Sequence, residues 1–259
     1  MQGWRSAGVD LSNAVVVRPS GRPVEGLKVV SNYGEAGPSP KLVVLGCKPQ
    51  QLDEVVARLT PHLTQQTVVV SILAGVEVET LRAKFWTAGA IVRALPNLPV
   101  AIRRGVVALY GEELPGELHD ELSQLFRQLG FALWTNNESG LAAVGSVAGA
   151  GPAYVARFVD ALAKAGVDRG LSADLARTIA LETVLGTAWM AATTQESMDD
   201  IVRRVASPNG TTEAGLAVLD QDRALDQLVA LTIEAAARRG AELAAEAEAA
   251  LLAGASQLH

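Results

Sequence analysis

The strongest constraint on the fold of this chain is a set of short apolar runs without polar alternation in its first half. Residues 67–73 (TVVVSIL) and 41–46 (KLVVLG) are two of these runs, and residues 51–63 between them have helical spacing. Strands without alternation are buried on both faces, so the pattern predicts a mostly parallel sheet covered by helices on both sides. The other predicted strands are residues 14–18, 90–95, 105–110 and 131–135, and the other predicted helices are residues 78–85 and 118–129.

The pattern changes after Asn137, and no strand is predicted from Gly140 onward. Three Ala- and Leu-rich segments predict long helices at residues 153–168, 172–194 and 212–252, the second with an N-terminal cap at Ser172. The chain is therefore expected to have an α/β domain at residues 1–138 and an all-helical domain at residues 139–259. Alanine-rich helices pack closely, and part of their surface is expected to be buried by a second subunit.

Composition excludes several classes of function. The net charge is -6 and the basic residues are scattered, which does not predict a nucleic-acid-binding face. No apolar run approaches the length of a membrane span. The single cysteine, Cys47, predicts a reducing compartment such as the cytoplasm, and the 3 histidines are too far apart to predict a metal site.

Three side chains follow directly after predicted strands. They are Lys48, Ala74 and Asn97. Ligands bind at the carboxyl ends of parallel strands, so these residues are expected to line one crevice. An exposed turn is the alternative interpretation of Lys48-Pro49, and a structural turn is the alternative for Asn97 between its two prolines.

The segment Ser207-Pro208-Asn209-Gly210-Thr211-Thr212 precedes a predicted helix. Small and hydroxyl residues before a helix leave backbone N–H groups free, and these groups bind anions together with the helix dipole. An ordinary helix cap is the alternative, and the two interpretations are compatible.

Five motifs together resemble the pyrroline-5-carboxylate reductase family. They occur in family order: 46–49 (GCKP), 71–76 (SILAGV), 96–99 (PNLP), 149–154 (GAGPAY) and 207–214 (SPNGTTEA). The last motif is the most specific, and the set covers nearly the whole chain. The resemblance implies a Rossmann-like cofactor domain, a helical dimerisation domain and NADPH-dependent reduction of 1-pyrroline-5-carboxylate to L-proline, the last step of proline biosynthesis.

The resemblance also assigns roles to residues of this chain. Ser207, Gly210, Thr211 and Thr212 would hold the imino acid substrate, with the Thr212 hydroxyl as the catalytic group at the imine nitrogen. The residues implied to contact the cofactor are Arg18, Asn32, Cys47, Lys48, Leu73, Ala74 and Asn97. Cys47 is expected to be an inert packing residue rather than a nucleophile. A homodimer is implied, or a decamer assembled from such dimers, with no metal.

Arg18 bears on which cofactor is used. In dinucleotide-binding folds an acidic residue at the corresponding strand end binds the 2′-hydroxyl of NADH, whereas an arginine accommodates the 2′-phosphate of NADPH. Arg18 is followed by Pro19 and Ser20, with no carboxylate, so NADPH is expected and NADH would be the weaker cofactor. A solvated surface arginine is the alternative.

The sequence departs from the family pattern at its beginning. The chain is expected to begin inside the first helix of the family fold, after the strand and glycine loop, because GxGxxG is absent; a start assigned too late is the favoured explanation. Asn209 stands where glycine is usual, and asparagine tolerates the left-handed conformation such a loop needs. The alternatives are a catalytically impaired remnant that acts only as a helical dimer, and another imine or hydroxyacid reductase using Lys164.

Overall fold

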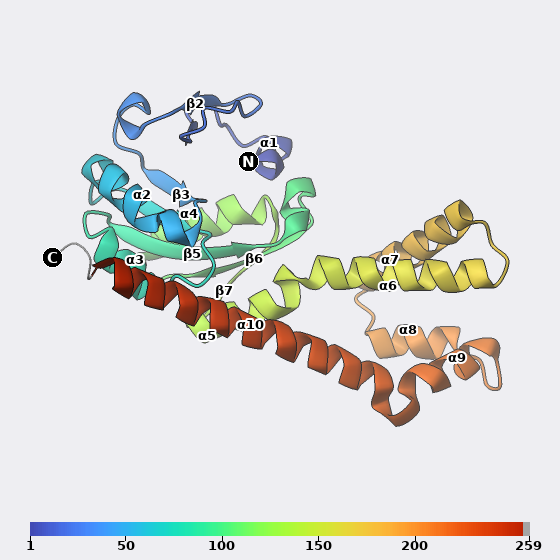
Figure 1. Ribbon diagram of the computed structural model, residues 1–259. Helices are drawn as coiled ribbons and strands as arrows, with labels where there is room; N and C mark the ends of the chain where they lie inside the picture. Colours follow the sequence, from blue (N-terminus) through green and yellow to red (C-terminus); the bar gives the residue numbers. More distant parts are fainter. Residues whose placement is uncertain (256–259) are drawn as a thin grey trace. The chain divides into compact units, whose positions relative to one another are not determined.

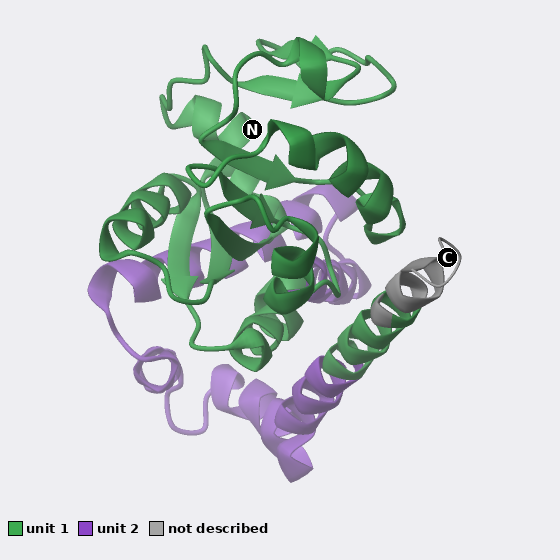
Figure 2. Cartoon of the chain, turned by 90° about the vertical axis from the view of Figure 1, so that its left-hand side faces the viewer, with its two compact units in different colours: residues 1–149, 236–259 green, residues 150–235 purple. Residues whose placement is uncertain are grey.

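The computed structural model describes residues 1–255 (Figure 1). The chain divides into two compact units (Figure 2). The first contains Met1–Gly149 together with the end of the chain from Ala236, and the second contains Ala150–Ala235. No helix among residues 1–255 is long and apolar enough to cross a membrane.

The first unit contains a five-stranded sheet in the order β3-β4-β5-β6-β7. All neighbouring strands are parallel except β5 and β6, which confirms the predicted mostly parallel sheet. The strands are β3 (Leu42–Leu45), β4 (Val68–Ser71), β5 (Ala90–Pro96), β6 (Gly105–Tyr110) and β7 (Gly130–Trp134). A separate parallel pair is formed by β1 (Val15–Val17) and β2 (Lys28–Val30), and β2 was not predicted.

Helices pack against both faces of the five-stranded sheet. Val69 and Ile91 lie in one hydrophobic cluster with α2 (Leu52–Leu59) and α3 (Val78–Lys84). Their strand neighbours Val70 and Val92 lie in a second cluster with α1 (Gln2–Ser6) and α4 (Gly116–Arg127). Successive strand residues point to opposite faces, so the strands are mostly apolar because both faces are covered.

The first unit continues past the sheet through a short helical segment. It consists of α5 (Glu138–Val144) and the π-helical turn Gly145–Gly149. The second unit is helical, and its described residues form no strand. Its helices are α6 (Gly151–Asp168), α7 (Ala173–Thr194), α8 (Met198–Val205), α9 (Thr211–Asp220) and the first part of α10 (Ala224–Ala255).

The predicted cap of α7 is present, but the predicted last helix is broken into two. The Ser172 side chain accepts a hydrogen bond from the Leu175 N–H, which confirms the cap on α7. The prediction of one helix over residues 212–252 is wrong, because the left-handed backbone of Asp222 (φ 53°) ends α9 and begins α10 in a new direction. Helix α8 was not predicted because it has only 8 residues and is rich in charged ones.

Candidate active site

The loops that carry Lys48, Ala74 and Asn97 lie at one edge of the sheet. Lys48 follows β3, Ala74 follows β4 and Asn97 follows β5, and these three strands are parallel neighbours. Their carboxyl ends therefore lie at the same edge, where open α/β sheets bind ligands. Lys48 and Ala74 are exposed there, whereas Leu73 is buried.

The Asn97 side chain connects three segments at this edge. Its Oδ1 accepts a hydrogen bond from the Val106 N–H at 2.8 Å, and its Nδ2 donates to the Ala148 carbonyl at 3.0 Å. These bonds fix the start of β6 and the π-helical turn against the end of β5. One amide hydrogen and the second lone pair of Oδ1 remain for a ligand.

Cys47 and Lys48 lie side by side but differ in environment. Cys47 is half-buried and packs against the hydrophobic cluster under α2, and this burial raises the pKa of its thiol. A raised pKa disfavours the thiolate, which agrees with a packing role rather than a nucleophilic one. Lys48 begins the 3-10 turn Pro49–Gln51, and its backbone N–H donates to Gln51 Oε1 at 3.3 Å. This leaves its ammonium group exposed.

Arg18 and Asn32 come together at the end of the small β1–β2 sheet. The Arg18 N–H donates to the Val30 carbonyl at 3.0 Å, and its Nη1 donates to the Arg22 carbonyl at 3.4 Å. Asn32 Oδ1 accepts from the Glu35 N–H at 3.1 Å and caps a 3-10 turn. The guanidinium group therefore lies at a strand end, where the prediction needs a cation.

The second predicted part of the site is the loop before α9. Asn209 has a left-handed backbone (φ 57°), which confirms that asparagine is accommodated where glycine is usual. The Gly210 N–H donates to the Ser207 carbonyl at 2.9 Å, which closes the turn, and Gly210 is the first cap residue of α9 with no side-chain cap bond. The first N–H groups of a helix have no partner within it, so this end of α9 can receive an anion.

Two contacts shape this loop further. A Cβ atom on Gly210 would lie 2.4 Å from Ser207 Oγ and 2.9 Å from the Ser207 carbonyl oxygen, so the turn requires glycine. The Glu213 Oε2 accepts a hydrogen bond from the Asn209 N–H at 2.6 Å. This carboxylate holds the left-handed residue in place. It was not predicted from the sequence. Glutamate at the third helical position commonly bonds the N–H of the cap residue, whereas here it bonds the residue before the cap.

One partly buried ion pair was not predicted from the sequence. Arg93 Nη1 on β5 donates to Glu138 Oε2, and Glu138 Oε1 accepts from the Val78 N–H at 2.9 Å. Arg93 is the one charged residue in the apolar run 90–95, and buried charge of this kind is rare without a partner. That signal was available, but the identity of the partner was not, because Glu138 is 45 residues away in the chain.

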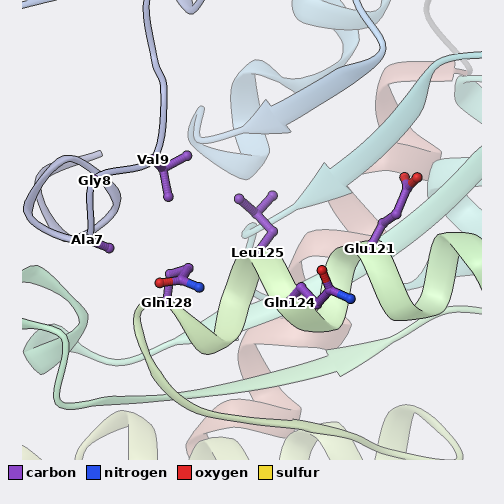
Figure 3. A pocket seen from close by; sticks show the side chains of 7 residues that line it. All are labelled: Ala7, Gly8, Val9, Glu121, Gln124, Leu125 and Gln128. Carbon is purple, nitrogen blue, oxygen red and sulfur yellow. The ribbon is translucent and has the colours of Figure 1, made fainter.

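The described residues form no metal cluster, and the pocket beside α4 is not lined by predicted site residues. The described residues contain no cluster of three or more His, Cys, Asp and Glu side chains that could hold a metal ion. A pocket of about 390 Å³ lies between the end of α1 and α4, and no predicted site residue lines it (Figure 3). Its walls include Val9, Glu121 and Leu125.

Two family models match this chain. The model "Pyrroline-5-carboxylate reductase dimerisation" matches residues 138–243, and the model "Ketopantoate reductase PanE/ApbA" matches residues 4–100. The first covers the helical half, and the second covers most of the sheet.

Whole-chain relatives agree with the first family model. A pyrroline-5-carboxylate reductase of Pseudomonas aeruginosa is 36% identical over 84% of this chain and 80% of its own length, and one of Synechocystis is also 36% identical over the same shares. The structure of a pyrroline-5-carboxylate reductase from Coxiella burnetii has a TM-score of 0.84 and 28% identity, covering 93% of this chain and 92% of that one. The Plasmodium falciparum pyrroline carboxylate reductase, solved with NADP bound, shares the fold with a TM-score of 0.80 at 23% identity over 92% and 90% of the two chains.

Proposed function

This chain belongs to the pyrroline-5-carboxylate reductase family, and on that premise we propose that it reduces 1-pyrroline-5-carboxylate to L-proline with NADPH. The observation that carries the proposal is the conformation of the loop before α9. Its glycine turn and left-handed Asn209 leave the start of a 10-residue helix open to an anion. A cyclic imine with one carboxylate is a substrate of that kind.

The residues of the first unit fit a dinucleotide cofactor. Three loops, with Lys48, Ala74 and Asn97, open at one sheet edge. The Arg18 guanidinium at the end of β1 would contact the 2′-phosphate of NADPH, so NADH would be the weaker cofactor. Asn32, Cys47 and Leu73 complete the proposed contacts. When bound, NADPH supplies the hydride to the imine carbon.

The chain's own residues would bind and orient the substrate. The N–H groups of Thr211 and Thr212, with the hydroxyl of Ser207, would hold its carboxylate, since these groups surround the open end of α9. The Thr212 hydroxyl would donate to the imine nitrogen, where the proton is needed. Catalysis then depends on orientation and on the placement of partial charges rather than on a nucleophile.

We also propose that the chain acts as a homodimer through the helical domain of residues 139–259, and that such dimers are the unit from which a decamer would assemble. Large apolar side chains of this part remain exposed in the single chain: Phe158 is 52% exposed, Leu185 56% and Trp189 54%. Large apolar side chains left exposed in a single chain are typical of an interface. A cytoplasmic location is proposed from the single cysteine.

The direct test is an assay of the full chain that measures both NADPH oxidation and proline formation. NADPH oxidation would be followed by the absorbance of the reduced nicotinamide, with and without 1-pyrroline-5-carboxylate. L-proline would be quantified by chromatography. We expect oxidation that depends on the imine, with equal amounts of proline. A folded dimer that binds neither compound would refute the proposal and favour a non-catalytic helical dimer.

A further inference from the structure

The Arg93–Glu138 ion pair is connected to both ends of the loop that follows β4. At one end, Arg93 Nη2 donates to the Leu73 carbonyl at 3.4 Å. At the other end, Glu138 Oε1 accepts from the Val78 N–H at 2.9 Å, where α3 begins. The two side chains, bonded to each other, therefore span the loop of residues 73–78.

Arg93 is buried and Glu138 is partly buried, so the partners of the arginine matter. Arg93 is 8% exposed, and its Nε has no hydrogen-bond partner among the described residues. A buried charge without a partner is costly, and Glu138 provides the carboxylate that compensates it. The two ends of the loop are thus fixed by the same ion pair.

The middle of the loop is held by packing: Val76 is buried in the core cluster, and Gly75 lies against the backbone of α10 at Ala244. Gly75 has a left-handed backbone (φ 74°), and Ala74 beside it is exposed at the sheet edge. Leu73 is buried and its N–H donates to Ser71 Oγ at 3.2 Å, which fixes the entry to the loop. The exit at Val78 is fixed by Glu138.

We propose that Arg93 and Glu138 are positioning residues that hold the 73–78 loop in the geometry that receives the nicotinamide cofactor. The inference rests on the proposed function, which places Leu73 and Ala74 in contact with that cofactor. Neither side chain touches substrate. Their effect is on cofactor affinity, through the position of the loop, and not on the reacting atoms.

The test uses two double variants of the full chain. Arg93→Met/Glu138→Leu removes both charges and leaves no isolated buried ion, a replacement that is often tolerated by the fold. The matched control is Lys84→Met/Asp53→Leu, which removes an ion pair of the same unit that joins α3 to α2 and does not contact the loop. Circular dichroism and the melting temperature establish folding. Hydrogen exchange of residues 72–78 and the NADPH dissociation constant are then measured.

For Arg93→Met/Glu138→Leu we expect faster exchange in residues 72–78, an NADPH dissociation constant raised by about tenfold or more, and a KM for 1-pyrroline-5-carboxylate changed less than about twofold. The control should leave all three unchanged. Unchanged exchange, or faster exchange with unchanged NADPH affinity, would overturn the inference. Failure of the proposed function gives a different result, because the unmodified chain would then bind no NADPH. The hydrogen-exchange measurement does not depend on NADPH, so unchanged exchange in the variant would still overturn the inference.

Discussion

Substitution of Gly210 by alanine tests the loop before α9 most directly. The backbone of Gly210 (φ -86°, ψ 170°) is accessible to any residue, so alanine adds no dihedral strain. The cost comes from space, because the new Cβ would lie 2.4 Å from Ser207 Oγ and 2.9 Å from the Ser207 carbonyl oxygen. Both distances are shorter than a Cβ atom tolerates. The Ser207 hydroxyl must rotate away, and the turn must open to relieve the contact with the backbone carbonyl.

The magnitude follows from the cost of overpacking. Inserting a methyl group without space costs about 1–3 kcal/mol. If that cost is borne by the substrate-binding conformation of the loop, it corresponds to a rise of about 5- to 150-fold in KM for 1-pyrroline-5-carboxylate. The NADPH dissociation constant should be unchanged, because the predicted cofactor residues lie in the first unit.

The assay is steady-state kinetics combined with a mutant cycle. In a Ser207→Ala background the 2.4 Å contact with Oγ is gone, so Gly210→Ala should cost less there than in the wild-type chain. Gly116→Ala is the control, because an added Cβ at Gly116 meets no atom within 4 Å. An unchanged KM in Gly210→Ala, or strictly additive effects of the two substitutions, would refute the reasoning.

Three further predictions concern single residues of the two predicted sites. Thr212→Ala should lower kcat by about 10²-fold or more, the size expected for loss of a positioned proton donor, while NADPH affinity stays nearly constant. Equal loss of kcat and NADPH affinity would contradict the role of Thr212 as donor to the imine. Arg18→Ala should narrow the ratio of kcat/KM for NADPH and NADH, and an unchanged ratio would remove Arg18 from the site. Glu213→Ala should raise KM for the imine, because the Asn209 N–H loses its acceptor. Glu213→Gln keeps an acceptor oxygen and should raise KM less. Equal effects of the two variants would show that the charge of Glu213, rather than its hydrogen bond, determines KM.

The site shows how far residue patterns reach. Lys48, Ala74 and Asn97 could be placed at one edge from sequence, because parallel strands align their carboxyl ends whatever the details of packing. The left-handed Asn209 was predictable for a local reason, because asparagine adopts this backbone conformation more readily than most residues. Arg93 and Glu138 were not predicted as a pair, since their bond depends on bringing together residues 45 positions apart.

The sequence by itself determined the fold class, the order of most strands and helices, and the family, because these depend on local periodicity and on ordered motifs. Tertiary structure alone decided the antiparallel pairing of β6 beside β5, the separate β1–β2 sheet and the break at Asp222 between α9 and α10. It also decided that Asn97 bonds Val106 and Ala148. The physical reason is that hydrophobic periodicity reports which face of an element is buried, whereas strand partners and side-chain hydrogen bonds depend on which distant segments share that burial.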